Sequence, residues 1–271
     1  MTTAFDDQYK SASVKTVDVL RPFTWLRMGW HDMLRCGWVS YLHGILFALF
    51  GGLVFFLARD RFWLLAGAFT GVLIIAPIMA TSLYALSRAL ERGEPISFNV
   101  VVNTWNQWQK SHTNKLGDDY WCLIRLGILL AFAATGWVLT SAAFITLMAQ
   151  TPINTPAEFV QHIILAKQGW VFELWLALGG VMAAPIFAST VLSVPVLLDC
   201  KVNMFQAILL SWRTVMGNPL IMGVWAAIIM FAIFLGSVFA FLGLIVAIPV
   251  LGHASWYAYR DLVDTTKWPK R

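Results

Sequence analysis

The chain has few charged residues. Asp, Glu, Lys and Arg together make up 12% of its 271 residues, whereas 59% are hydrophobic. Soluble domains carry about 25% charged residues, so this composition excludes an ordinary soluble globular protein and indicates that lipid covers much of the surface. The chain carries 19 basic and 14 acidic residues, and this positive balance is typical of the cytoplasmic side of a membrane protein. We therefore expect membrane lipids, and possible membrane-protein partners, but no nucleic acid.

The chain also lacks the short motifs of soluble enzymes. It contains no GxxxxGK[ST], no GxGxxG after a strand, no GxSxG and no HExxH. Its cysteines, Cys36, Cys122 and Cys200, are far apart and form no CxxC pair, which argues against a disulfide framework or a structural zinc. No CxxCH is present for covalent haem attachment. We predict no catalytic residues and no bound metal, and therefore a protein that is not an enzyme.

Long apolar stretches dominate what is present. A helix needs about 20 apolar residues to cross a membrane, and five stretches of at least that length lack Asp, Glu, Lys and Arg: 36–58, 62–87, 126–157, 174–198 and 214–259. The last is long enough for two crossings, with Gly236 and Gly243 at the reversal. The prediction is an all-α, polytopic membrane protein with six transmembrane helices, at roughly 38–58, 62–88, 122–148, 170–198, 218–237 and 240–260.

The distribution of positive charge predicts the orientation of these helices. With six spans and both termini in the cytoplasm, only three of the 19 basic residues lie outside, namely Arg59, Arg61 and Lys167. This distribution is the one that the positive-inside rule requires. Residues 1–21 form a polar N-terminal extension without the apolar core of a signal peptide. The membrane domain covers 22–263, and 264–271 form a basic C-terminal tail.

The chain repeats one unit. The heptad APIMATS at 76–82 returns as APIFAST at 184–190, and a weaker copy, IPVLGHAS, occupies 248–255. A segment of mixed polarity, typical of an amphipathic helix in the cytoplasmic interface, precedes each odd-numbered span. The prediction is three repeats of an interfacial helix followed by a transmembrane hairpin, at about 22–90, 96–200 and 202–263.

Each heptad places a proline inside an apolar span. Pro77, Pro185 and Pro249 each lack an N–H, so one helical carbonyl loses its partner. Hydroxyl side chains follow about one turn later, among them Ser82, Ser189 and Thr190. One interpretation is a kink with close packing of small residues. The other is a polar cavity or gate between the repeats.

Two histidines lie within the predicted spans. His43 and His253 are expected at similar depth in the cytoplasmic half, and an ionisable residue inside a span is a candidate functional residue. The pair could ligate haem or a metal, or each could be a hydrogen-bonded core histidine. His253 is the position at which the third heptad differs from the other two by a titratable side chain.

Several phrases together resemble a known family. They are PFTWLRMGWHDML, IIAPIMATSLYALSRALERGEP, SVPVLLD and the closing AIPVLGHASWYAYRDLV. The chain resembles, over roughly 20–263, the bacterial integral membrane proteins grouped as domain of unknown function 2189. The resemblance implies a multi-pass protein of the cell inner membrane, and it defines no active-site residues.

Three functions are compatible with these patterns. The scarcity of charged or catalytic groups inside the spans favours a non-enzymatic accessory, scaffold or assembly factor. The repeats and aligned prolines are compatible with a small-solute transporter or channel. His43 and His253 are compatible with a haem- or metal-binding membrane redox protein.

Overall fold

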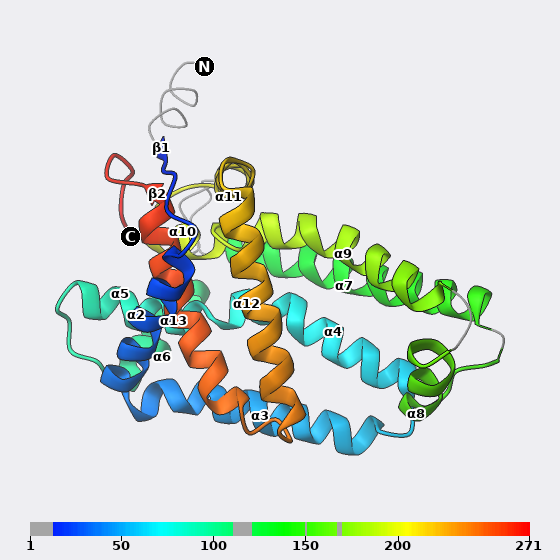
Figure 1. The fold of residues 1–271 in the computed structure, drawn as a ribbon. Helices are drawn as coiled ribbons and strands as arrows, with labels where there is room; N and C mark the ends of the chain where they lie inside the picture. The colour runs from blue at the N-terminus through cyan, green and yellow to red at the C-terminus, as the bar shows by residue number, and fades with distance from the viewer. Residues whose placement is uncertain (1–12, 111–120, 150, 167–169) are drawn as a thin grey trace.

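The computed structural model describes residues 13–110, 121–149, 151–166 and 170–271, and it is mostly helical (Figure 1). Residues 1–12 of the N-terminal extension, Lys167 and the side chain of Cys122 lie outside the described part. In chain order the elements are β1 (Ser13–Val14), α2 (Arg21–Cys36), α3 (Trp38–Ala58), α4 (Phe62–Met79), α5 (Thr81–Glu91), α6 (Phe98–Lys110), α7 (Trp121–Met148), α8 (Pro156–Phe159), the π-helix η1 (Val160–Ile164), α9 (Val171–Thr190), α10 (Ser193–Asp199), α11 (Met204–Gly217), α12 (Pro219–Val238), α13 (Leu244–Leu262) and β2 (Val263–Asp264).

Four helical segments are long and apolar enough to cross a membrane. They are Trp38–Ala58, Leu123–Met148, Val171–Asp199 and Pro219–Val238. The bent pair Phe62–Val72 and Ala76–Glu91, which meet at 44°, is a fifth candidate. The sixth predicted span forms α13, but the second half of this helix, HASWYAYRDL, is more polar than the other five. The described chain is therefore a multi-pass helical membrane protein with four or five candidate spans.

Helices α4, α9 and α13 continue through their prolines. Helix α4 continues through Pro77 and ends at Met79, and α9 continues through Pro185 to Thr190. At the first break, the Thr81 hydroxyl donates to the Ile78 carbonyl over 2.6 Å. A hydroxyl that bonds back to its own helix competes with the backbone ladder and promotes bending. The 44° bend of the first copy nevertheless lies between Val72 and Ala76, in the turn before Pro77, where the sequence predicted a kink. In the second copy Val171–Asp199 forms one candidate span, and α13 runs unbroken through Pro249.

Helix α13 is at the centre of the packing and contacts α2, α3, α5 and α12. Two glycines allow its backbone to be approached closely. A Cβ on Gly29 of α2 would lie 2.5 Å from the Val250 carbonyl oxygen, and one on Gly44 of α3 would overlap the Ile245 carbonyl group. Such glycine contacts allow helices to pack closely where lipid supplies no hydrophobic driving force.

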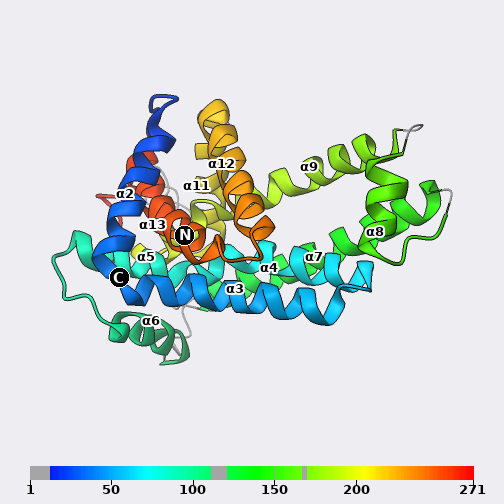
Figure 2. The same ribbon diagram turned by 60° about the horizontal axis from the view of Figure 1, so that its bottom comes forward.

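The helices take two main directions. In Figures 1 and 2, α3, α4, α7 and α9 run in roughly the same direction, with α8 at one end, while α2 and α12 cross this direction steeply. The turn between α12 and α13 reaches α3 and α4, where Phe241 stacks on Phe69 with ring centroids 5.6 Å apart. The α12–α13 hairpin is therefore inclined to the other candidate spans.

The two ends of the described chain pack together. Strand β1 pairs with β2 in antiparallel register, with Ser13 opposite Asp264 and Val14 opposite Val263. Farther along the C-terminal segment, Trp268 is 3% exposed. Residues 13–20 and 263–271 are thus folded against the helices, a feature that no pattern in either polar segment had predicted.

Candidate functional site

His253 lies at the centre of a buried polar network. It is fully buried on α13, and both of its ring nitrogens have partners. The hydroxyl of Ser40 on α3 lies 2.8 Å from Nε2, and that of Ser87 on α5 lies 2.8 Å from Nδ1. Ser40 and Ser87 are also fully buried. Three helices therefore meet around one imidazole.

The network continues from Ser87 to a carboxylate on a fourth helix. The Ser87 hydroxyl donates to Oδ2 of Asp32 on α2 over 2.8 Å, and the Tyr257 hydroxyl donates to the same oxygen over 2.8 Å. Since the Ser87 proton points to Asp32, its oxygen accepts from Nδ1–H of His253, and Nε2 accepts from Ser40. We call Ser40, His253, Ser87, Asp32 and Tyr257 the His253 network.

Burial and hydrogen bonding have opposite effects on Asp32. This carboxyl is 1% exposed, and burial raises its pKa because the charged form loses solvation. Hydrogen bonds from Ser87 and Tyr257, followed by the charges of Arg35 and His31, act to lower the pKa, but desolvation is the largest effect. A buried carboxyl that accepts two hydrogen bonds orients its neighbours and contributes to a specific packing arrangement.

His43 takes no part in this network. It is half-buried on α3, and its Nδ1–H donates to the Val39 carbonyl of the same helix over 2.8 Å. A shared haem or metal would require His253 to give up a serine partner, because both of its nitrogens are occupied. Within the described residues, no three His, Cys, Asp or Glu side chains are close enough to hold a metal ion.

The predicted hydroxyl residues bond to partners elsewhere. The indole of Trp105 donates to Ser82 over 2.7 Å, and the indole of Trp212 donates to Ser189 over 2.9 Å. In both pairs the tryptophan lies 23 residues after the serine, on α6 in the first pair and on α11 in the second. Thr190 donates to the Ile186 carbonyl of its own helix over 2.9 Å.

The aligned prolines have different surroundings. Pro249 is buried beside the His253 network, Pro77 is half-buried, and Pro185 is exposed. The residues that the sequence aligned by repeat therefore divide among three places: Ser82 with α6, Ser189 with α11, and His253 with α2, α3 and α5.

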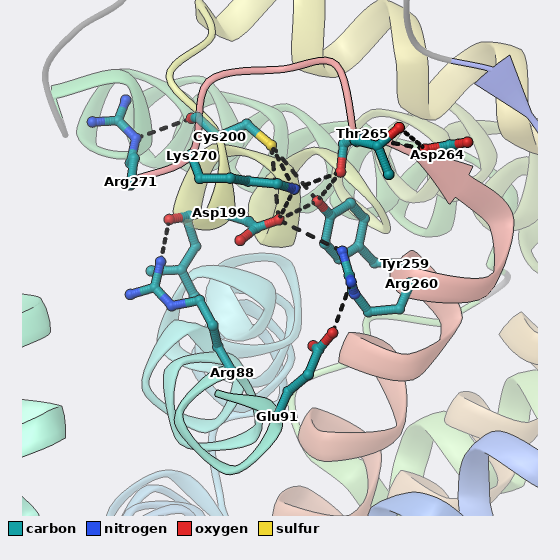
Figure 3. Close-up of polar contacts among 12 residues, drawn as sticks. Arg88, Glu91, Asp199, Cys200, Tyr259, Arg260, Asp264, Thr265, Lys270 and Arg271 are labelled. Atoms are coloured by element: carbon teal, nitrogen blue, oxygen red, sulfur yellow. Dashed lines mark hydrogen bonds and ion pairs between the residues drawn. The ribbon is translucent and has the colours of Figure 1, made fainter. Parts of the chain in front are cut away.

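A second polar cluster, which the sequence did not single out, surrounds Asp199 at the end of α10 (Figure 3). The Asp199 side chain is 5% exposed and accepts from Lys270 Nζ over 2.6 Å and from the Tyr259 hydroxyl over 2.7 Å. Arg92 lies 3.4 Å from its other oxygen. The carboxylate therefore connects α5, α10, α13 and the C-terminal segment.

Neighbouring groups extend this Asp199 cluster. Arg260 pairs with Glu91 over 2.7 Å, and Glu91 also accepts from the Trp256 indole over 3.0 Å. The backbone of Arg271 donates to the Asp199 carbonyl over 2.9 Å. The sequence signalled this cluster only in that Asp199 ends an apolar stretch, because its partners are up to 107 residues distant in sequence.

Comparison with known proteins gives one match. A family model described as "Predicted integral membrane protein (DUF2189)" matches residues 64–199. This range includes the first two heptads, SVPVLLD and Asp199, but not the closing phrase around His253. No curated protein and no solved structure matches the chain. Because the matched range covers half of the sequence, the chain belongs to the DUF2189 family of predicted integral membrane proteins.

Proposed function

We propose that the protein is a non-enzymatic accessory, scaffold or assembly factor of the cell inner membrane. The observation that supports this most is the hydrogen bonding of His253, the titratable residue that the sequence singled out inside a predicted span. Its two nitrogens are taken by Ser40 and Ser87, and one oxygen of the adjoining Asp32 accepts from both Ser87 and Tyr257. Such a network holds helices together and leaves neither nitrogen of His253 free to act on a substrate.

The exposed apolar side chains support a role that depends on lateral contacts. Phe132 on α7 is 71% exposed, Val181 on α9 is 72% exposed and Phe231 on α12 is 65% exposed. Lipid covers such faces by default, and other transmembrane helices bind on the same kind of surface. The proposal assigns part of this surface to protein partners.

The proposed topology has six membrane helices in three repeats, with both termini in the cytoplasm. The equal spacing of the Trp105–Ser82 and Trp212–Ser189 pairs supports the repeat. The turn between α3 and α4, which contains Arg59 and Arg61, lies far from β1 and β2 in Figure 1, and this supports the orientation. In this proposal α12 and α13 form the third hairpin despite their inclination.

Labelling of single cysteines tests the topology. Asp60→Cys, Ala240→Cys and Thr266→Cys place one thiol in the first predicted outer turn, one in the third and one in the C-terminal segment, after the native cysteines are replaced by alanine. A membrane-impermeant maleimide should label the first two in intact spheroplasts and Thr266→Cys only after lysis. Labelling of Ala240→Cys only from the inside would make α12–α13 a re-entrant hairpin.

Mild-detergent purification with identification of every co-purifying protein tests the function. A stable partner in fixed ratio to the chain is the expected result. A solitary protein that moves a small solute across liposomes would contradict the proposal and favour the transporter.

A further inference from the structure

Helix α2 has two unlike faces. Its inner face packs on α13 through Trp25 and Gly29, and its only acidic residue, Asp32, points inward and is 1% exposed. The outer face remains uncovered by any described part of the chain, although it carries large apolar side chains. This face therefore contacts something outside the described part of the chain.

The outer face carries two parallel lines of residues. Phe23, Trp30 and Leu34 are 56%, 49% and 53% exposed, and their spacing of seven and four residues aligns them along one side of a helix. Beside them, Arg27, His31 and Arg35 follow at intervals of four, so they form an adjacent line. An apolar line next to a cationic line is the pattern of helices that lie in a membrane interface.

Within the described residues, no salt bridge neutralises the cationic line. Arg35 and His31 act on the buried Asp32 only through space, and no carboxylate among the described residues makes a salt bridge with Arg27, His31 or Arg35. Guanidinium groups bind phosphate in planar, bidentate geometry. The exposed cations are thus available to phosphate groups outside the protein.

Relative to the candidate span α3, helix α2 has the orientation of a helix that lies along a membrane surface. Gly37, with φ of 57°, turns the chain between α2 and the candidate span α3. Helix α2 crosses the end of α3 steeply in both views (Figures 1 and 2). Trp38, at the start of α3, is 65% exposed and stacks on Phe98 of α6, as expected of an aromatic side chain at headgroup level.

We propose that the outer face of α2 binds anionic phospholipid, with Phe23, Trp30 and Leu34 among the acyl chains and Arg27, His31 and Arg35 on the headgroup phosphates. The inference deepens the proposed function, since it rests on a cytoplasmic position for α2. It gives the accessory protein a preferred lipid environment on one leaflet.

Native mass spectrometry of the full chain in mild detergent, with equal amounts of phosphatidylglycerol and phosphatidylcholine, tests this proposal. The wild type should retain phosphatidylglycerol at least ten-fold more tightly than phosphatidylcholine. Arg27→Gln/Arg35→Gln should lose about five-fold for each arginine. The matched control Arg59→Gln/Arg61→Gln, at the other end of α3, should bind as the wild type does. Because all four arginines are exposed, circular dichroism and the unfolding midpoint should be unchanged in both variants.

Equal retention of the two lipids by the wild type, or an equal loss in both double variants, would overturn the proposal. Displacement of phosphatidylglycerol by polyglutamate that binds more tightly would also overturn it and assign the face to an acidic protein segment. Lipid retention is measured on the isolated chain, so failure to find a protein partner leaves this result unaffected.

Discussion

The hydroxyl of Ser87 lies 2.8 Å from Nδ1 of His253, and it donates a hydrogen bond to Oδ2 of Asp32, also over 2.8 Å. One serine thus joins two ionisable side chains from α13 and α2, neither of which reaches solvent. In a membrane protein, such a bridge replaces the water that would otherwise solvate both groups.

Ser87→Ala should therefore destabilise the protein more than an ordinary hydroxyl deletion. It leaves the Nδ1–H of His253 without an acceptor and removes one donor to Asp32, and each unmet buried group costs about 1–3 kcal/mol. We expect the free energy of unfolding in mild detergent to fall by about 2–4 kcal/mol. Ser237→Ala is the matched control, because Ser237 bonds only to Ile233 of its own helix, and it should cost less than about 1 kcal/mol. Equal losses in both variants would show that the bridge has no special role.

Asp32→Asn should change the pH dependence of stability. Burial raises the pKa of Asp32 in the folded protein above its ordinary value of 3.8, so the folded state holds this proton more tightly than the unfolded state. The stabilisation is complete below about pH 4 and is lost as pH rises through the folded pKa.

Asparagine cannot ionise, so the difference between wild type and Asp32→Asn isolates this effect. The free energy of unfolding of the wild type, minus that of the variant, should decrease as pH rises from 4 and then become constant. Unfolding curves for both proteins in one detergent between pH 4 and 8 measure it. A difference that increases with pH would mean that the folded state favours the ionised carboxylate.

Gly29→Ala tests the close contact between α2 and α13. The added Cβ would meet the Val250 carbonyl oxygen at 2.5 Å and the Ala254 nitrogen at 2.7 Å, so the helices must separate. We expect a loss of about 2 kcal/mol or more in unfolding free energy, as for other overpacked cores. Gly223→Ala on α12 has open space around the new Cβ. This control should be neutral or stabilise by up to about 1 kcal/mol through helix propensity.

Asp199→Ala should release the C-terminal segment. Lys270, Arg92 and Tyr259 would lose their common acceptor, but the two cations are more than one-third exposed, so water would compensate in part. We expect a loss of about 1–3 kcal/mol and faster amide hydrogen exchange across residues 263–271. Asp264→Ala is the control in the same segment, since this carboxylate bonds only to Thr266 nearby. Unchanged exchange in Asp199→Ala would mean that backbone pairing alone holds the segment.

The apolar stretches predicted the helices well because the length of a charge-free segment is a local property. The predicted 38–58 coincides with α3, and the predicted 122–148 differs from α7 by one residue at its start. The mixed-polarity segments also form helices, as α2, α6 and α11. The helix ends at Met79 and Thr190 were not predicted, because the apolar pattern continues through both positions.

The candidate site was predictable only in part. His253 could be singled out because a titratable residue in an apolar stretch is rare. Its partner Ser40 is 213 residues away in sequence, and Ser87 is 166 residues away. Neither pairing follows from helical periodicity. The docking of Lys270 on Asp199 depends on how the chain ends fold back, which the polarity of the C-terminal segment does not encode.

Photo-crosslinking in intact cells tests the proposed accessory role most directly. A photoreactive amino acid would replace Phe132, Val181 or Phe231, one at a time, on the exposed faces of α7, α9 and α12. The control is the same replacement at Trp225, which is fully buried. The account predicts a discrete adduct with another membrane protein from at least one exposed position and none from Trp225. Adducts with lipid alone at all three exposed positions, in cells where the protein is fully folded, would contradict it.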